Sequence, residues 1–298
     1  DFGKGEKDMK KSIGEKLFDI FMYGCIGIGI LLILYPLYFI LIASISDQNL
    51  VANGQVFLFP KEIQFGGFKR VFENDLLLSG YRNTILYTSL GTVFNMILTI
   101  PAAYALSRKD FLPRRILMFL FVFTMYFSGG LVPTYLLMKD LRLLNTIWVM
   151  IIPFAVNVTN LIIARSFFES SIPDELLEAA VMDGCSNTKF FLHIVLPLSK
   201  AILAVITLYY AVQHWNEYFN ALIYLKDTAL YPLQLVIRDI LVMNQKASAS
   251  ASAASSAVQI AEQVKYAVIL VSTVPVMLFF PFVQKYFMKG VMIGAVKG

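Results

Sequence analysis

The sequence predicts an all-α membrane protein: one domain, residues 1–298, built on six transmembrane helices. Of its 298 residues, 58% are hydrophobic and only 15% are charged, whereas a soluble globular domain carries about 25% charged residues. The hydrophobic residues also gather in long runs, and roughly 20 apolar helical residues span a bilayer core about 30 Å thick. These two observations exclude an ordinary soluble domain.

Six segments are long and apolar enough to span a membrane. They cover about residues 18–43, 84–106, 116–137, 146–168, 199–223 and 266–287. The first follows a cluster of lysines, as the hydrophobic region of a signal peptide would, but its apolar run is too long for one. We therefore interpret residues 18–43 as an uncleaved membrane anchor.

The basic residues predict the orientation of these spans. The short loop between the second and third spans carries Arg108, Lys109, Arg114 and Arg115, and short loops rich in Lys and Arg remain in the cytoplasm. Because an even number of spans places both termini on one side, both are expected to be cytoplasmic. The Ala/Ser tract at 247–257 then lies outside, and its composition fits either a flexible linker or a weak helix.

A compact acidic segment lies between the fourth and fifth spans, within residues 169–198. A helix is expected from Pro173, since proline suits the first helical turn and Asp174 complements the positive end of the helix dipole. Gly184 can adopt the left-handed conformation that ends a helix, and Ser186 can cap the next one. One face of the first helix is apolar and comprises Leu176, Leu177, Ala180 and Val181.

Three roles are compatible with a short acidic helix in this position. A helix lying on the cytoplasmic membrane surface needs a basic polar face, but residues 173–183 contain four acidic residues and no Lys or Arg. A helix packed only on its own bundle remains open. A docking element for a soluble protein partner is favoured.

The spacing within the acidic segment resembles the EAA loop of binding-protein-dependent ABC importer permeases. The matching positions are Glu178, Ala179, Ala180, Gly184, Ile194, Leu196 and Pro197. In that family the loop is the coupling helix, seated in a cleft of the ATP-hydrolysing subunit. The resemblance therefore implies an ATPase-coupling role for these seven residues and for Asp183.

The same resemblance implies a set of partners and a location. These are a second homologous permease subunit, a dimer of ATP-binding subunits that hold ATP and Mg, and an extracytoplasmic sugar-binding protein, in a prokaryotic cytoplasmic membrane. This chain has no phosphate-binding G-x-x-x-x-G-K-[ST] motif, so it is not expected to be an enzyme or to hold a cofactor of its own. It has no long basic stripe, so nucleic acid is not an expected partner.

Two further resemblances concern the cargo. The C-terminal residues resemble the tail of the second permease in maltose-type sugar importers, which implies ATPase contacts for Gly290, Gly294, Lys297 and Gly298; an unstructured terminus is the alternative. Residues 127–135 resemble a branch that imports oligosaccharides from complex polysaccharides, including acidic ones. Gly129, Gly130 and Pro133 are also expected to loosen the third span near its outer end.

Polar residues inside the spans are candidates for a substrate path, because they tend to face a bundle interior or a water-filled cavity. Gln213, Glu217 and Asn220 have the i, i+4, i+7 spacing of one helical face. The other candidates are Tyr126, Asn157, Asn160 and Trp215. Two alternatives stay open, since Asn and Gln also join helices to each other and Trp is common at the membrane interface.

Other functions remain possible from the sequence. The same machine could import a non-sugar solute, or the chain could act alone as an ion-coupled carrier with Glu217 as its proton site. A metal site is not expected, because neither His193 nor His214 has a second histidine or cysteine at metal-ligand spacing.

Overall fold

The computed structural model describes residues 13–250, 264–275, 277–278 and 281. Every regular element in these residues is helical, which confirms the all-α prediction. The expected ATPase-contacting tail (Gly290, Gly294, Lys297 and Gly298) lies outside the described residues. So do residues 251–257 of the Ala/Ser tract and residues 276, 279–280 and 282–287 of the span expected at 266–287, whose described residues are helical.

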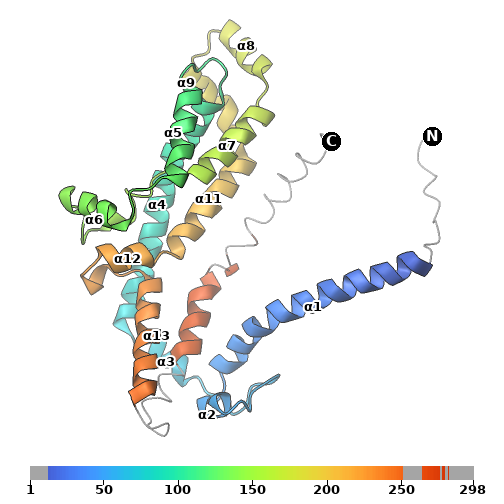
Figure 1. Ribbon diagram of the computed structural model, residues 1–298, viewed down its shortest axis with the longest axis vertical. Coiled ribbons are helices and arrows are strands. Elements are labelled where there is room, and N and C mark those ends of the chain that lie inside the picture. Colours follow the sequence, from blue (N-terminus) through green and yellow to red (C-terminus); the bar gives the residue numbers. More distant parts are fainter. Residues whose placement is uncertain (1–12, 251–263, 276, 279–280, 282–298) are drawn as a thin grey trace.

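Helix α4 (Asp75–Ser107) is the centre of the fold. It packs against α7 (Val158–Ser171), α11 (Lys200–Trp215) and α13 (Leu233–Ser250), as Figure 1 shows. Asn74 caps its first turn by accepting hydrogen bonds from the amides of Leu76 and Leu77. Close packing is possible because many buried α4 positions are small or polar, as is common between membrane helices. They include Gly80, Thr84, Gly91, Thr92, Asn95, Thr99 and Ala103.

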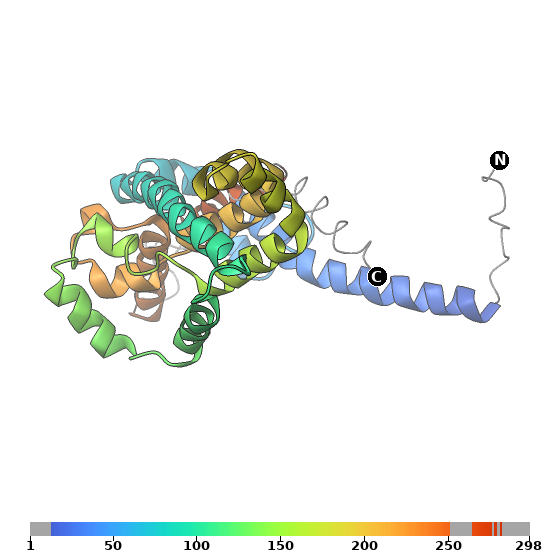
Figure 2. The same ribbon diagram turned by 90° about the horizontal axis from the view of Figure 1, so that it is seen from above.

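Helix α1 (Ile13–Ser44) projects away from this bundle, and both views show the separation (Figures 1 and 2). Only 6% of its most apolar window is buried. Its end leads into α2 (Gln48–Ala52) and α3 (Gly66–Phe72) at one end of the molecule. Within the described residues, α1 and α4 are the two helices long and apolar enough to cross a membrane; two bent helix pairs would make four.

The segment expected as one helix at 116–137 is bent. Helix α5 (Arg114–Tyr126) and helix α6 (Leu131–Asp140) meet at 113°. Gly130 lies between them with a φ of 86°, a conformation that favours glycine. The expected loosening at Gly129 and Gly130 is therefore present, and it is large enough to end the helix.

Two other expected spans also differ from continuous helices. Residues 146–168 form a short 3₁₀ helix, η1 (Ile147–Met150), then non-helical chain, and α7 begins only at Val158. Residues 199–223 form α11 and the separate helix α12 (Phe219–Tyr224). The break follows Trp215, and beside it the Glu217 carboxylate accepts a hydrogen bond from the amide of Asn220, in the first turn of α12, at 3.0 Å. A short helix, η3 (Thr228–Leu230), leads on to α13.

The main hydrophobic core lies among α4, α7 and α11. Its largest fully buried side chains are those of Phe168, Phe190, Ile206 and Tyr210. Phe190 belongs to the connection between α7 and α11, so this core also anchors that connection. The core thereby positions the acidic segment that the sequence singles out.

Candidate functional site: the loop between α7 and α11

The acidic segment folds into helix α8 (Asp174–Met182), at one extremity of the molecule (Figure 1). The helix ends at Gly184, whose φ is 71°. The amide of Cys185 donates to the carbonyl of Ala180 at 2.8 Å, and that of Gly184 to Val181 at 2.9 Å. This pair of bonds is a Schellman motif, so the predicted glycine stop is confirmed.

A second helix follows at once, as predicted. Ser186 caps α9 (Asn187–Phe190) by accepting a hydrogen bond from the amide of Lys189 at 3.4 Å. The chain continues through a π-helical turn, η2 (Phe191–Val195), and α10 (Leu196–Leu198). The whole run from Asn187 to Leu198 meets α11 at 83°. The loop therefore reaches across the end of the bundle before it enters α11.

The inner side of the loop is buried in the main core. Ala180, Phe190 and Val195 are buried there, and Leu177, Ile194 and Leu196 pack against them. The single apolar face predicted for α8 is only partly right, because Leu176 and Val181 point away from the core and are 40% and 55% exposed. Met182 beside them is 88% exposed.

The outer side of the loop is therefore apolar with acidic neighbours. Among the residues matching the EAA pattern, those facing outward are Glu178, Ala179, Gly184 and Pro197, with Asp183 next to them. Exposed large apolar side chains close to charged groups are characteristic of protein-interaction surfaces rather than of a helix packed only on its own bundle. The loop thus combines a buried side fixed to the bundle with an outer side open to a partner.

Basic side chains hold the beginning of α8. Lys109 Nζ lies 2.7 Å from Asp174 Oδ2, and Arg108 Nη1 lies 3.5 Å from Asp174 Oδ1. The hydrogen bond from Lys109 is the main cause that lowers the pKa of the Asp174 carboxyl, and the positive charges of Arg108 and Arg114 act in the same direction. The same hydrogen bond raises the pKa of Lys109. The loop between α4 and α5 is thereby attached to α8.

The substrate-path candidates are not brought together. Gln213 lies on α11, Glu217 in the helix break and Asn220 on α12, so the face expected to be continuous is interrupted. Tyr126 ends α5 with a side chain that is 78% exposed. Trp215 is almost buried, and its indole nitrogen has no hydrogen-bond partner within the described residues.

The two asparagines on α7 do lie together. Asn157 caps the helix, its side-chain oxygen accepting a hydrogen bond from the amide of Asn160 at 3.2 Å. Asn160 itself is buried. For Asn157 the geometry indicates a structural role in starting α7.

A buried polar network that the sequence did not predict joins α4 to α11. His214 Nε2 lies 2.7 Å from Asn95 Oδ1, and the amide nitrogen of Asn95 donates to the carbonyls of Phe154 and Ala155 at 2.9 and 2.7 Å. Because that oxygen can only accept, His214 donates from Nε2. One turn along, the Tyr210 hydroxyl lies 2.6 Å from Thr99 Oγ1. The four-residue spacing of Asn95 and Thr99, matched by Tyr210 and His214, was the available signal.

The tyrosine also reaches the start of α7. Its hydroxyl accepts a hydrogen bond from the amide of Asn157 at 3.0 Å. Three helices therefore meet at Tyr210, which is fully buried.

Comparison with known proteins gives the family. Residues 77–293 match the family described as binding-protein-dependent transport system inner membrane component. The chain belongs to this family. The matched region begins in the first turn of α4, so helices α1 to α3 precede it. The loop between α7 and α11 lies well inside it.

This permease is similar along nearly its whole length to bacterial relatives. It is 40% identical over 285 residues to the polygalacturonan/rhamnogalacturonan transport system permease protein YtcP of Bacillus subtilis, covering 95% of this chain and 99% of the relative. It is 39% identical over 272 residues to protein LplC of the same organism, covering 91% and 92%.

A solved structure supports the same relationship. This permease resembles a chain in the crystal structure of a bacterial ABC transporter involved in the import of the acidic polysaccharide alginate. The TM-score is 0.83, the sequence identity is 37%, and the alignment covers 93% of this permease and 99% of that chain. The fold is thus that of an ABC importer permease, and the chain is an integral membrane transport subunit rather than an enzyme.

Proposed function

We propose that this permease is one of two homologous membrane subunits in an ATP-driven importer of oligosaccharides, including acidic fragments of polysaccharides. A dimer of ATP-binding subunits would bind ATP and Mg, and an extracytoplasmic sugar-binding protein would deliver the substrate. Both termini and α8 would face the cytoplasm, since the basic loop from Arg108 to Arg115 lies beside α8.

The exposure of the outer side of α8 is the single observation on which the proposed coupling role rests. Its exposed residues Leu176, Val181 and Met182 offer an apolar contact to the ATPase, while Ala180 fixes the helix to the main core. A displacement of α8 would therefore be passed to α4, α7 and α11. If the bundle exchanges between two conformations, the ATPase shifts the equilibrium towards the conformation that it binds more tightly.

The proposed cargo rests on the relatives. One relative is a transport permease for polygalacturonan and rhamnogalacturonan, and the solved structure is of a transporter that imports alginate. These polymers bear carboxylates. Identity near 40% over almost the complete chain is the support for carrying this class over to the present permease.

Transport by the assembled importer tests the cargo. The permease is reconstituted in vesicles with its partner permease, ATPase and binding protein, and uptake of labelled oligogalacturonides is compared with that of neutral oligosaccharides of equal length. ATP-dependent uptake of the acidic sugars is expected. Absence of any sugar uptake would indicate a non-sugar cargo, and uptake driven by a proton gradient without the ATPase would indicate an ion-coupled carrier.

Charge reversal on α8 tests the coupling role. The variant Glu178→Lys is expected to insert normally and to lose stimulation of ATP hydrolysis by the loaded binding protein, because an acidic contact becomes a repulsive or unpaired one. Asp140→Lys, at the exposed end of α6, is the matched control and should retain stimulation. Equal stimulation in both variants would refute the assignment.

The C-terminal tail is tested by deletion. Removal of residues 290–298 is expected to weaken transport more than membrane insertion if the tail contacts the ATPase. Full transport by the truncated permease would favour an unstructured terminus.

A further inference from the structure

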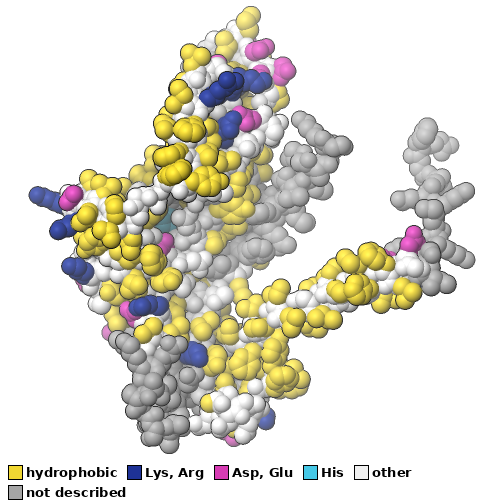
Figure 3. Space-filling model, viewed as in Figure 1, with side chains coloured by type: hydrophobic (Ala, Val, Ile, Leu, Met, Phe, Trp, Pro, Cys, Tyr) yellow, Lys and Arg dark blue, Asp and Glu magenta, His cyan; other side chains and the backbone are white. Residues whose placement is uncertain are grey.

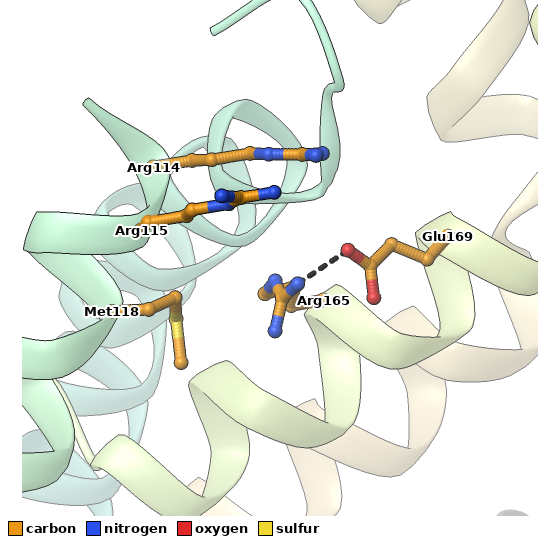
Figure 4. Close-up of a pocket in the computed structure, with 5 residues that line it drawn as sticks. All are labelled: Arg114, Arg115, Met118, Arg165 and Glu169. Carbon is orange, nitrogen blue, oxygen red and sulfur yellow. Dashed lines mark hydrogen bonds and ion pairs between the residues drawn. The ribbon is translucent and has the colours of Figure 1, made fainter. Parts of the chain in front are cut away.

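A cavity lined by arginines lies between α5 and α7. Its volume is about 300 Å³, and its lining residues are Arg114, Arg115, Met118, Arg165 and Glu169. Figure 4 shows the guanidinium groups of Arg114 and Arg115 side by side, directed towards the Arg165–Glu169 ion pair. Since Arg115 is exposed, the cavity opens at the surface of the molecule.

The charges in this cavity are not balanced. Glu169 is its one acidic residue, and Arg165 pairs with it while donating from Nε to the carbonyl of Leu106 at 3.1 Å. Across the part of the chain that the structure describes, neither Arg114 nor Arg115 forms an ion pair. Both also stand at the N-terminus of α5, where the helix dipole adds positive potential. The cavity is therefore suited to an anion.

An apolar stripe starts directly below this charge. Phe119, Phe123 and Phe127 follow Arg115 at successive four-residue intervals, and all three are exposed. Their rings form a ladder, with centroid separations of 6.3 Å from Phe119 to Phe123 and 4.4 Å from Phe123 to Phe127. Figure 3 shows basic side chains gathered near α8 with hydrophobic surface beneath them.

The length of the stripe discriminates between soluble and amphiphilic anions. Twelve residues separate Arg115 from Phe127, which corresponds to about 18 Å at the helical rise of about 1.5 Å per residue. One leaflet of a bilayer has a hydrocarbon thickness of about 15 Å. A soluble phosphate would contact only the arginines, whereas a phospholipid would contact the arginines with its phosphate and the phenylalanine ladder with its acyl chain.

We propose that Arg114, Arg115 and Arg165 bind the phosphate of an anionic phospholipid whose acyl chain lies along Phe119, Phe123 and Phe127. Guanidinium groups suit a phosphate because they donate paired hydrogen bonds in a fixed geometry. In the orientation proposed above, this lipid belongs to the cytoplasmic leaflet, where anionic lipids attract basic residues. Lipid in this position would rest against α7 and the loop that holds α8.

Lipid retention by the assembled importer tests this site. The importer is placed in bilayer discs of mixed phosphatidylcholine and phosphatidylglycerol, extracted into mild detergent, and analysed by native mass spectrometry. The double variant Arg114→Gln/Arg115→Gln is expected to retain phosphatidylglycerol roughly twenty-five-fold less well, because each of the two interfacial basic residues contributes about a factor of five. Retention of phosphatidylcholine should not change.

Two variants control for charge and for folding. Arg114→Lys/Arg115→Lys keeps both charges and should retain more phosphatidylglycerol than the glutamine variant. Lys139→Gln/Arg142→Gln, at the end of α6, should retain as much as the unmodified importer. Equal retention in the glutamine variant and this control would overturn the proposal, as would equal loss in the lysine and glutamine variants.

A competition experiment separates the lipid from a soluble anion. Excess inorganic phosphate or glycerol phosphate should leave phosphatidylglycerol bound, because neither occupies the phenylalanine ladder. A photoreactive acyl chain on phosphatidylglycerol should label the α5 peptide containing Phe119 and Phe123. Displacement by phosphate, or labelling of the second permease in place of α5, would overturn the assignment to a lipid.

Discussion

Lys109 and Asp174 join two loops that are 65 residues apart in the sequence, with the amine 2.7 Å from the carboxylate. Arg108 reaches the same carboxylate at 3.5 Å. The first turn of α8 is thus held by charge, while its last turn is held by the Schellman motif and by burial of Ala180. A nine-residue helix secured at both ends is expected to move with the bundle as one body.

Removal of this charge should weaken coupling modestly. For Asp174→Asn we expect stimulation of ATP hydrolysis by the loaded binding protein to fall by at most about fivefold, because exposed ion pairs contribute little. Stimulation should also become less sensitive to salt, which screens the original pair. The measurement is ATPase activity over a range of ionic strength. A variant with undiminished salt sensitivity would show that another pair is responsible.

The pH dependence of the pair follows from its two pKa shifts. The pKa of Asp174 is lowered in the fold, so its stabilising effect is complete above the ordinary Asp value of about 3.9 and is lost as pH falls through the lowered pKa. The pKa of Lys109 is raised, so its effect is complete below the ordinary Lys value of about 10.4 and is lost as pH rises through the raised pKa. The pair should therefore contribute the same amount to coupling at every pH between about 5 and 9. The measurement is the difference in ATPase stimulation between the unmodified importer and Asp174→Asn. If the difference in ATPase stimulation between the unmodified importer and Asp174→Asn varies with pH in this window, the Lys109–Asp174 pair is not its cause.

Gly184, the glycine that ends α8, should be required for its left-handed backbone conformation and not because a larger side chain would clash. A Cβ at Gly184 would meet nothing within 4 Å, so Gly184→Val costs only the backbone strain of a positive φ, about 1–2 kcal/mol. We expect this variant to insert and to lose ATPase stimulation, whereas Gly184→Asn keeps most of it because Asn tolerates this conformation.

Gly54 provides the matched control, because its φ of 68° and open surroundings are equivalent and it lies far from α8. Gly54→Val should lose a similar amount of stability, measured by thermal unfolding, and retain stimulation. Loss of stimulation in both valine variants would mean that general stability, not the position of α8, explains the effect.

Local signals in the sequence predicted the loop well and the long helices less well. Gly184 and Ser186 each specify a helix end through their own backbone or side chain, so both helix ends can be predicted without knowledge of tertiary contacts. The break after Trp215 contains neither glycine nor proline, and apolar residues follow again directly after it. There the Glu217 carboxylate accepts a hydrogen bond from the amide of Asn220, and such a local bond from side chain to backbone competes with continuation of the helix.

The isolation of α1 could not be predicted either. Side chains that face lipid and side chains that pack against helices are equally apolar, so the sequence does not distinguish them. The substrate-path candidates fail to assemble for a related reason: Gln213 and Asn220 share a face only if the helix between them is unbroken. The network at Tyr210 could not be predicted from spacing alone, because which polar residues of α4 face those of α11 depends on how the two helices pack.

Close packing between α4 and α11 predicts a steric effect at Gly91. A Cβ there would lie 2.4 Å from His214 Nε2, and His214 cannot move freely because it is hydrogen-bonded to Asn95. Gly91→Ala is therefore expected to destabilise the permease by about 1–3 kcal/mol, seen as a lower unfolding temperature. Gly29→Ala, on α1, meets nothing within 4 Å and should be neutral or slightly stabilising.

The second substitution His214→Ala should relieve that clash. The double variant Gly91→Ala/His214→Ala is then less destabilised than the sum of its single variants, because the two positions touch. Simple additivity would show that Gly91 is required for a reason other than the imidazole.

Removing one buried hydroxyl tests the junction of α4, α7 and α11. Tyr210→Phe leaves Thr99 Oγ1 without its partner and removes the acceptor of the Asn157 amide. Buried polar groups left unpaired cost about 1–3 kcal/mol, so the unfolding temperature of the purified importer should fall. Tyr126→Phe is the control, since that side chain is 78% exposed. Thr99→Val should cost less than Tyr210→Phe, because the tyrosine then still accepts from Asn157. If Tyr210→Phe unfolds at the same temperature as Tyr126→Phe, the hydroxyl is not what joins the three helices.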